Sequence, residues 1–384
     1  MITRRSFAAA AGAALAAEKK IRLAVVGGGF GTSFYWHEHP GCTVAAVTDL
    51  YAERRTRLRD TYQCDSVYES MEDMLAKRRD LDAIAIFSGA PDHARQAIAC
   101  MRRGLHVISA VPACLTLAEA AHLKEAKEKT GMRYMMAETS YYRQAAIYAR
   151  EMYQGGGFGR IHYSEVEYYH DDNREAMIAD KGSRYYNPDG SHSWRQMLPP
   201  MLYPTHSLGF VVGVSRERIT QVSCLGWGDA ALIAKFPTNR YKNPHLNQFA
   251  QMQTNKGHMV RCNVFWQIAA DGERAQWFGD KGSFYMAKTG FHPDMWHPRY
   301  GKPQPANVPK YWSTDRLPEK MRHDSGHGGS HTFLADEFIR ALLEDREPAI
   351  DIYESLAMTV PGIVAHQSAQ KSGETMKVPS FDRA

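Results

Sequence analysis

The sequence predicts two domains. The first is a doubly wound parallel α/β sheet, and the second is an open, mainly antiparallel β-sheet. Residues 21–26, Ile-Arg-Leu-Ala-Val-Val, form a short apolar run typical of a strand buried on both faces. Strand-like and helix-like stretches alternate as far as residue 136, which is the pattern of parallel strands with crossover helices. From residue 160 onward, strand-like runs follow one another closely with turn signals between them, as in an antiparallel sheet.

A glycine-rich turn follows the first predicted strand, with Gly27, Gly29 and Gly31 in close succession. The stretch after it can be helical until Pro40-Gly41, and the second predicted strand ends in Asp49. Glycines permit the tight turn and let a pyrophosphate approach the backbone at a helix N-terminus. A carboxylate in this place can bind both ribose hydroxyls and repels a 2′-phosphate. The pattern predicts a Rossmann domain that binds NAD.

Nearby charges keep NADP open as an alternative, because Arg54 and Arg55 follow Asp49 closely. The later elements of this domain are predicted as strands at 81–87, 106–109 and 133–136, and as helices at 52–62, 71–78, 92–103 and 117–129. Thr116 and Glu119 form a capping box at the last helix, and Gly131 ends it.

Ligands of such sheets bind at the carboxyl ends of the strands. The residues that follow the predicted strands are therefore the candidates for contact with the cofactor. This set is Gly27, Gly29, Phe30, Gly31, Asp49, Ser88, Pro91, His93, Val111, Pro112 and Glu138.

Four short motifs in this domain carry a family resemblance. They are Gly-Gly-Gly-Phe-Gly at 27–31, Ala-Pro-Asp-His at 90–93, Gly-Leu-His-Val at 104–107 and Val-Pro-Ala at 111–113. In these motifs and their order the chain resembles the glucose-fructose oxidoreductase, inositol dehydrogenase and rhizopine-catabolism (Gfo/Idh/MocA) superfamily. The resemblance implies NAD(P) and a sugar-like substrate. Most of that superfamily has Glu-Lys-Pro where this chain has Ala110-Val111-Pro112, and valine cannot relay a proton.

The second domain is expected to span 141–384, after a nucleotide-binding domain at 18–140. We predict a helix at 142–154 and strands at 160–170, 219–225, 249–254, 258–266, 275–279 and 282–286. Residues 292–324 are rich in proline, aromatic residues and charge, and we predict a long ordered loop there. A helix is predicted at 330–344, and the helical segment 330–384 is expected to pack back on the first domain.

Three stretches of the second domain offer candidate chemistry: 168–172 (Tyr-Tyr-His-Asp-Asp), 203–206 (Tyr-Pro-Thr-His) and 327–331 (His-Gly-Gly-Ser-His). A histidine beside a tyrosine can serve as acid or base. We favour function for Tyr203 and His206, weigh it evenly for His170, and read His327 and His331 as ordinary hydrogen-bonded histidines. His170, Asp171, Asp172 and His206 are acceptable metal ligands but lack a ligand-spacing motif, so no metal is predicted.

A closer resemblance appears in residues 135–143, Met-Met-Ala-Glu-Thr-Ser-Tyr-Tyr-Arg, and in Tyr-Pro-Thr-His at 203–206. These stretches, with the missing lysine, resemble the NAD-dependent family 109 glycoside hydrolases. The resemblance implies oxidation of the sugar at C3 by NAD, proton removal at C2, loss of the C1 substituent, water addition and re-reduction. It implies catalytic roles for Tyr203, His206 and His170. The family continues Tyr-Pro-Thr-His with glycine, where this chain has Ser207.

Three other functions stay open. One is an NAD(P)-dependent sugar oxidoreductase with a tightly held cofactor. Another is a redox-silent carbohydrate lyase that uses Tyr and His, with or without a metal, on an acidic polysaccharide. The third is a non-enzymatic sugar-binding protein. A carbohydrate is the expected partner in each case, and the superfamily resemblance implies a homo-oligomer.

The composition and the N-terminal residues indicate which partners and which cellular location to expect. The 384 residues carry a net charge of +5 that is not gathered in a block, so nucleic acid is not an expected partner. Thr3-Arg4-Arg5-Ser6-Phe7 begins a twin-arginine pattern, and we expect residues 1–17 to be a signal for export to the periplasm or beyond. Its apolar stretch is too short to span a bilayer, so stable membrane insertion is not expected. The six cysteines form no C-x-x-C pair and are expected in the core.

Overall fold

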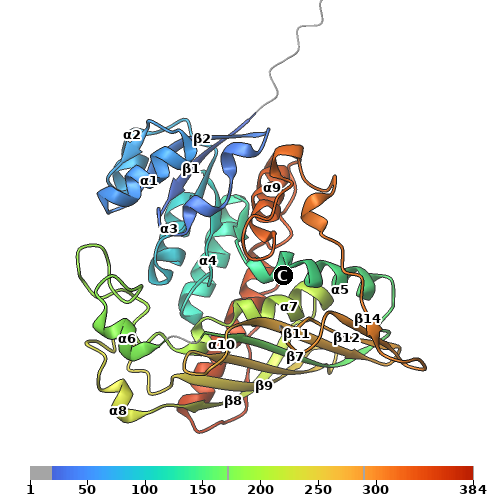
Figure 1. Cartoon of the computed structure of the whole chain (residues 1–384). Helices are drawn as coiled ribbons and strands as arrows, with labels where there is room; N and C mark the ends of the chain where they lie inside the picture. The colour runs from blue at the N-terminus through green and yellow to red at the C-terminus, as the bar shows by residue number, and fades with distance from the viewer. Residues whose placement is uncertain (1–19, 171–172, 289, 384) are drawn as a thin grey trace, which may run out of the picture.

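The computed structural model describes residues 20–170, 173–288 and 290–383, and it contains two β-sheets, each with its own helices (Figure 1). The expected signal at 1–17, together with Asp171 and Asp172, lies outside the described residues. Within the described part of the chain, no helix is both long and apolar enough to cross a membrane.

The first domain is the predicted parallel sheet, with strand order β3-β2-β1-β4-β5-β6. Its strands are β1 (Ile21–Val26), β2 (Cys42–Thr48), β3 (Val67–Tyr68), β4 (Ala83–Ile86), β5 (His106–Ser109) and β6 (Tyr134–Met136). The crossover helices are α1 (Ala52–Tyr62), α2 (Met71–Lys77), α3 (His93–Met101) and α4 (Leu117–Thr130). Leu23, Ala24 and Val25 are fully buried, because helices cover both faces of a doubly wound sheet. The strand order changes direction between β1 and β4, and doubly wound sheets bind their ligands at the carboxyl ends of the strands at such a point.

The ends of α4 form as the sequence predicts. Thr116 accepts from the Glu119 N–H and Glu119 bonds back to the Thr116 N–H, which completes the capping box. Gly131 ends the helix at φ +69°, a left-handed conformation that glycine adopts without strain.

The expected helix after the glycine turn is wrong. Two single 3₁₀ turns, Gly31–Ser33 and Trp36–Glu38, take its place, separated by Tyr35 at φ +55°. Phe34 and Trp36 are both fully buried. Residues two apart cannot share one face of an α-helix, so burying both aromatic rings requires an irregular path.

The second domain holds a nine-stranded sheet in the order β14-β13-β12-β11-β7-β10-β9-β8-β15. Its strands are β7 (Ile161–Tyr169), β8 (Ile219–Trp227), β9 (Asn247–Thr254), β10 (Met259–Phe265), β11 (Gly272–Gly279), β12 (Gly282–Tyr285), β13 (Met295–Pro298), β14 (Gln304–Pro305) and β15 (Met376–Lys377). All neighbouring pairs are antiparallel except β7 and β10. The predicted loop at 292–324 is therefore partly wrong, since β13 and β14 extend the sheet there.

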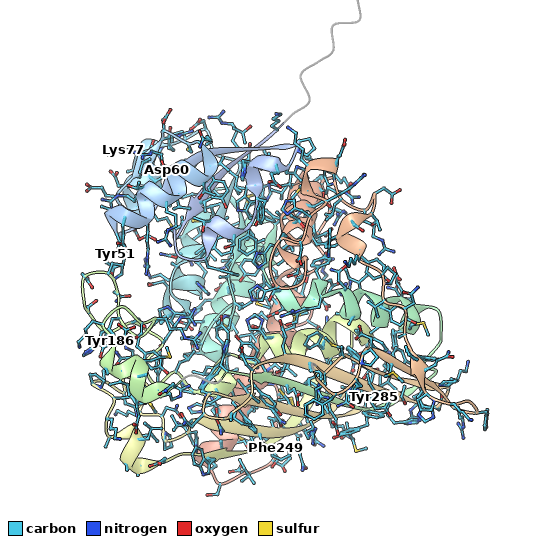
Figure 2. The ribbon with its side chains drawn as sticks, in the orientation of Figure 1. Tyr51, Asp60, Lys77, Tyr186, Phe249 and Tyr285 are labelled. Carbon is cyan, nitrogen blue, oxygen red and sulfur yellow. The ribbon has the colours of Figure 1, made fainter. Side chains whose placement is uncertain are left out.

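One face of this sheet is covered by helices and the other is open. The domain's helices are α5 (Gln144–Gln154), α6 (Arg174–Ala179), α7 (Thr205–Ser215), α8 (Ala230–Ile233), α9 (Ser330–Leu343) and α10 (Ile352–Gln370). α7 lies on the covered face and is buried at every residue. Phe249 and Tyr285 are labelled at the sheet in Figure 2, and Phe249 lines a shallow depression on the open face.

The last helix, α10, joins the two halves of the molecule. It packs against α4 and β6 of the first domain and against α7 and β8 of the second. Just before it, the Ile350 carbonyl accepts from the Met136 N–H at the edge of the parallel sheet. At Gly362 a side chain would meet the Met201 carbonyl at 2.2 Å, so α10 fits closely against the segment that leads to residue 203.

The six cysteines, Cys42, Cys64, Cys100, Cys114, Cys224 and Cys262, are all buried and free, which confirms their assignment to the core.

Candidate active site between the two sheets

The glycine turn has the shape that a dinucleotide needs. Gly27 has φ +97°, and a Cβ there would lie 2.3 Å from the Phe87 carbonyl oxygen, so no other residue fits. A Cβ on Gly29 would meet no heavy atom within 4 Å. The backbone at Gly29 is therefore open to a ligand. Gly31 closes the turn by donating to the Gly27 carbonyl.

The carboxylate of Asp49 reaches the same turn. Its Oδ2 accepts from the Gly28 N–H at 2.7 Å, and its Oδ1 accepts from the Tyr51 N–H at 2.9 Å. Each carboxylate oxygen has a second acceptor position. Asp49 can thus hold the turn and still accept from ribose hydroxyls, so the residues present fit NAD.

His93 is placed among the other predicted cofactor residues but uses both its ring nitrogens within the protein. Nδ1 lies 2.8 Å from the Pro112 carbonyl and Nε2 lies 3.1 Å from the Ser88 carbonyl. Burial lowers the pKa of His93, which favours the neutral ring, and a neutral ring donates to one of these two carbonyls at a time. The ring ties the ends of β4 and β5 together. Val111 is buried beside it, and Pro91 lies in the short turn before α3.

Glu138, predicted at the cofactor, is the direct partner of His206. The two side chains are joined by a 2.8 Å contact from Nδ1 to Oε1. Glu138 is fully buried and also accepts from the Ser140 N–H at 2.8 Å. Burial opposes a charge on His206, but attraction from Glu138 and Glu273 outweighs it, and the pKa of His206 is raised.

A second carboxylate, which no sequence motif indicates, lies beside His206. Glu273, on β11, bonds to Ser140 Oγ at 2.6 Å and forms an ion pair with Arg143. Its side chain is 3% exposed. No local signal points to it, because β11 is brought beside Ser140 only by sheet pairing more than a hundred residues away.

His327 and His331, read as ordinary histidines, lie between the two domains. The His327 ring stacks on that of His206 at 6.5 Å, and its Nδ1 bonds to His331 Nε2 at 2.8 Å. His331 Nδ1 in turn lies 2.8 Å from the Ser33 carbonyl of the glycine-turn region. Phe30 packs edge-on against both rings. A line of imidazoles therefore runs from the nucleotide domain to His206.

His170 belongs to a separate hydrogen-bonded chain. The Asp271 carboxylate lies 3.2 Å from Nδ1, and the Tyr168 hydroxyl lies 2.6 Å from Nε2. If Nδ1 carries the proton, Nε2 accepts from Tyr168. The Tyr168 ring lies 4.6 Å from that of His206 and stacks with Tyr203 at 6.1 Å. Through Tyr168, the structure brings all three predicted catalytic residues together.

A pocket opens beside Tyr203. It is lined by Tyr168, His170, Arg174, Arg184, Tyr185, Arg195, Leu198, Tyr203 and Trp266. Burial raises the pKa of Tyr203, while the charges of Arg195 and Arg184 oppose this rise. The net shift of the Tyr203 pKa is upward, and the two arginines limit it.

A segment of the second domain reaches back to the first on either side of this pocket. A Cβ on Gly89 would lie 2.7 Å from Trp194, so the indole packs directly on the turn after β4. Farther out, Asp189 and Ser191 lie near enough to the Tyr51 hydroxyl to act on its pKa. Figure 2 shows Tyr51 extending from the first domain toward the loop that carries Tyr186. The segment thus spans from the Asp49 end of the nucleotide site to the catalytic side chains.

The described residues contain no group of three or more His, Cys, Asp or Glu side chains arranged to hold a metal ion. Asp171 and Asp172, two members of the cluster considered from the sequence, lie outside the described residues.

The sequence matches known families over nearly its whole length. Residues 21–138 match the oxidoreductase family with an NAD-binding Rossmann fold (GFO_IDH_MocA), and residues 142–384 match the C-terminal domain of glycosyl hydrolase 109. A glycosyl hydrolase family 109 protein of Solibacter usitatus is 25% identical over 340 residues, which cover 80% of this chain and 73% of the relative. One from Streptomyces coelicolor is 23% identical over 97% of this chain and 85% of its own length.

Solved structures share the fold at low sequence identity. The WlbA dehydrogenase of Bordetella pertussis, solved with NADH and UDP-GlcNAcA, is 18% identical with a TM-score of 0.72, over 94% of this chain and 99% of its own. The aldose-aldose oxidoreductase of Caulobacter crescentus is 17% identical with a TM-score of 0.71, over 94% and 100%. With an NAD-binding Rossmann domain followed by a family-specific second domain, this chain belongs to the glycosyl hydrolase 109 family.

Proposed function

We propose that this protein is an NAD-dependent glycosidase that oxidises its sugar only transiently. The observation that carries the proposal is the buried His206–Glu138 pair beside Tyr203, next to the nucleotide domain. Glu138 follows β6 of the NAD-binding sheet, whereas Tyr203 and His206 come from the second domain. A sugar held between the domains would face the cofactor on one side and these two groups on the other.

Bound NAD would supply reversible oxidation at C3, which acidifies the proton on C2 and lets the C1 substituent leave before water adds. Val111 stands where most of the superfamily has its lysine and cannot move a proton. The proton transfers must therefore fall on other side chains. This favours the glycosidase over a sugar oxidoreductase of the usual kind.

Tyr203 is assigned as the base at C2. Its side chain lines the pocket, and the charges of Arg195 and Arg184 partly offset the rise in its pKa that burial causes. His206 is assigned to the C3 hydroxyl, since its raised pKa favours a proton on the ring while Glu138 holds Nδ1. His170 acts through Tyr168 and orients it.

The first test uses the purified mature chain without added nicotinamide. Denaturation should release NAD or NADH, identified by mass, at close to one molecule per chain. The cofactor-loaded protein should then cleave aryl glycosides with no electron acceptor present. Tyr203→Phe should lower turnover by about 10²-fold or more while the bound nucleotide remains. Full activity in this variant would remove Tyr203 from the mechanism.

A failure of the first measurement would also be informative. A chain that carries no nucleotide and has no affinity for NAD would contradict the proposal and favour a redox-silent lyase.

We also propose export by the twin-arginine route, on the basis of Arg4-Arg5 and the short apolar stretch after them. That route carries folded proteins, and the six free, buried cysteines need no oxidising compartment. Replacing both arginines by lysine should leave the protein in the cytoplasm, as fractionation of the producing cells would show.

We also propose that the protein forms a homo-oligomer. The open face of the nine-stranded sheet carries Phe249, Met259 and other partly apolar side chains. Light scattering on the purified protein should give a mass that is a multiple of the monomer mass, and a monomer mass would contradict this proposal.

A further inference from the structure

We propose that the pocket beside Tyr203 binds an anionic substituent of the sugar, a carboxylate or a sulfate ester, so that acidic glycosides are the substrates. The inference rests on the proposed function in one respect: it takes the sugar to lie next to Tyr203. The charge and geometry of the pocket carry the rest.

The lining is strongly cationic. Of the nine described residues that line the pocket, three are arginines (Arg174, Arg184 and Arg195) and the other six include no aspartate or glutamate. Arg174 and Arg184 each have partners within the protein. The nearest described carboxylates serve other groups. Asp271 contacts His170, and Glu138 and Glu273 hold His206 and Arg143. A concave site lined by one sign of charge raises the local concentration of ligands of the opposite sign.

Arg195 is the arginine best placed to meet a ligand. Its Cζ lies 4.4 Å from the centre of the Trp194 ring, and Trp194 is itself packed on Gly89. Within the described ranges Arg195 forms no ion pair with a carboxylate, and its guanidinium hydrogen-bonds the Tyr203 side chain. Stacking fixes the plane of a guanidinium and leaves its N–H edge to bind a carboxylate or sulfate through two parallel hydrogen bonds.

Arg174 forms part of the pocket floor. It is 3% exposed, its Nε donates to the Trp266 carbonyl at 3.1 Å, and it packs on the Tyr185 ring. It is therefore held in place and adds positive charge below the ligand.

The anion is expected on the substrate and not on the cofactor. All nine lining residues belong to the second domain, between Tyr168 and Trp266. The glycine turn that fits a pyrophosphate lies in the first domain, where Gly29 and Asp49 mark it. The pocket instead adjoins Tyr203, at which the sugar would react.

The experiment measures binding of free sugars to the full, cofactor-loaded chain by calorimetry. Glucuronate and galacturonate represent the carboxylate, galactose 6-sulfate represents the sulfate ester, and glucose and galactose are the neutral controls. At least one acidic sugar should bind about tenfold or more tightly than its neutral parent, a preference that corresponds to one charge-assisted contact. Whether uronates or the sulfated sugar show the preference tells the two anions apart.

Single substitutions test which side chain causes the preference for acidic sugars. Arg195→Gln should abolish it, and Arg195→Lys should keep part of it. Tyr203→Phe should retain it, because the cation remains. Arg102→Gln removes a charge from an exposed position after α3 and should change nothing.

Three results of the binding experiment would overturn the inference: equal binding of acidic and neutral sugars, a preference that survives in Arg195→Gln, or no binding of any acidic sugar. The proposed glycosidase fails separately. Tight binding of a uronate with no cleavage of any glycoside would contradict the proposed function and leave the anion site standing. Cleavage of neutral glycosides alone would contradict the anion site and leave the proposed function standing.

Discussion

Glu138 controls the charge of His206, and the contact is open to a direct test. In Glu138→Gln the 2.8 Å ion pair is lost while burial of the ring remains. The pKa of His206 should therefore fall from its raised value to below that of a free histidine. NMR titration of the imidazole measures this directly. Turnover should drop by about 10²-fold, with a shifted pH profile.

A matched control lies elsewhere in the same domain. Glu217 and His258 form another buried pair, 3.2 Å apart, away from the pocket. Glu217→Gln should cost stability, because it also leaves a buried imidazole without its carboxylate, but the pH profile of turnover should not move. If both variants change the profile alike, Glu138 has only a structural role.

Two glycines of the same turn should respond differently to one added methyl group. Gly29→Ala meets no protein atom, so the melting temperature of the nucleotide-free protein should be unchanged while affinity for NAD falls about tenfold or more. Gly27→Ala would place Cβ 2.3 Å from the Phe87 carbonyl at a positive φ, and it should lower stability itself. Calorimetry of NAD binding and thermal unfolding separate the two effects.

Among the helices, α7 packs so closely against Tyr141 that only glycine fits at the point of contact. A Cβ on Gly213 would lie 2.8 Å from the buried Tyr141 ring. Alanine is intrinsically better in a helix than glycine by about 1 kcal/mol, yet Gly213→Ala should destabilise the protein by about 1–3 kcal/mol through overpacking. The same substitution should cost less when it is made in a Tyr141→Leu background, because the ring that the new Cβ would meet is then absent. Denaturant unfolding of the single and double variants gives the free energies.

The sequence predicted most elements whose pattern is local. Strands 106–109 and 219–225, the capping box at Thr116 and the glycine turn each carry their signal within a few residues. α7 carries no such signal, because a helix that is buried all round shows no apolar face. The short edge strands β13 and β14 exist only because they pair with β12, a contact that no local pattern shows.

The candidate site divides in the same way. Tyr203, His206 and His170 stood out from the sequence because tyrosine and histidine occur side by side there. Glu273 and Arg195 did not stand out, and His327 was interpreted as an ordinary histidine, since the partners that make these residues important lie far along the chain. The second function of Glu138 was hidden for the same reason: its partner lies 68 residues away.

For the whole molecule, two buried histidines predict loss of stability in mild acid. Burial lowers the pKa of His331 and of His366 to about 4, from about 6.5 when exposed. The unfolded chain therefore binds protons that the folded protein does not, and stability falls as pH drops from 6.5 toward 4. Each residue should contribute about 2 kcal/mol of loss by pH 5.

Denaturant midpoints from pH 7 to pH 5 check this. His366→Asn, which can still accept from the Gln248 amide, should show a shallower decline than the parent. A decline of equal slope would show that other groups dominate the acid response.

Because α10 contacts both sheets, the order in which the chain is made has a consequence. The first domain emerges from the ribosome early, yet the edge of β6 and one side of α7 stay uncovered until residues 350–370 follow. A polypeptide that stops short of them keeps apolar surface that chaperones and proteases recognise. On the proposed export route, which accepts folded proteins, a chain that lacks this helix would therefore be held back.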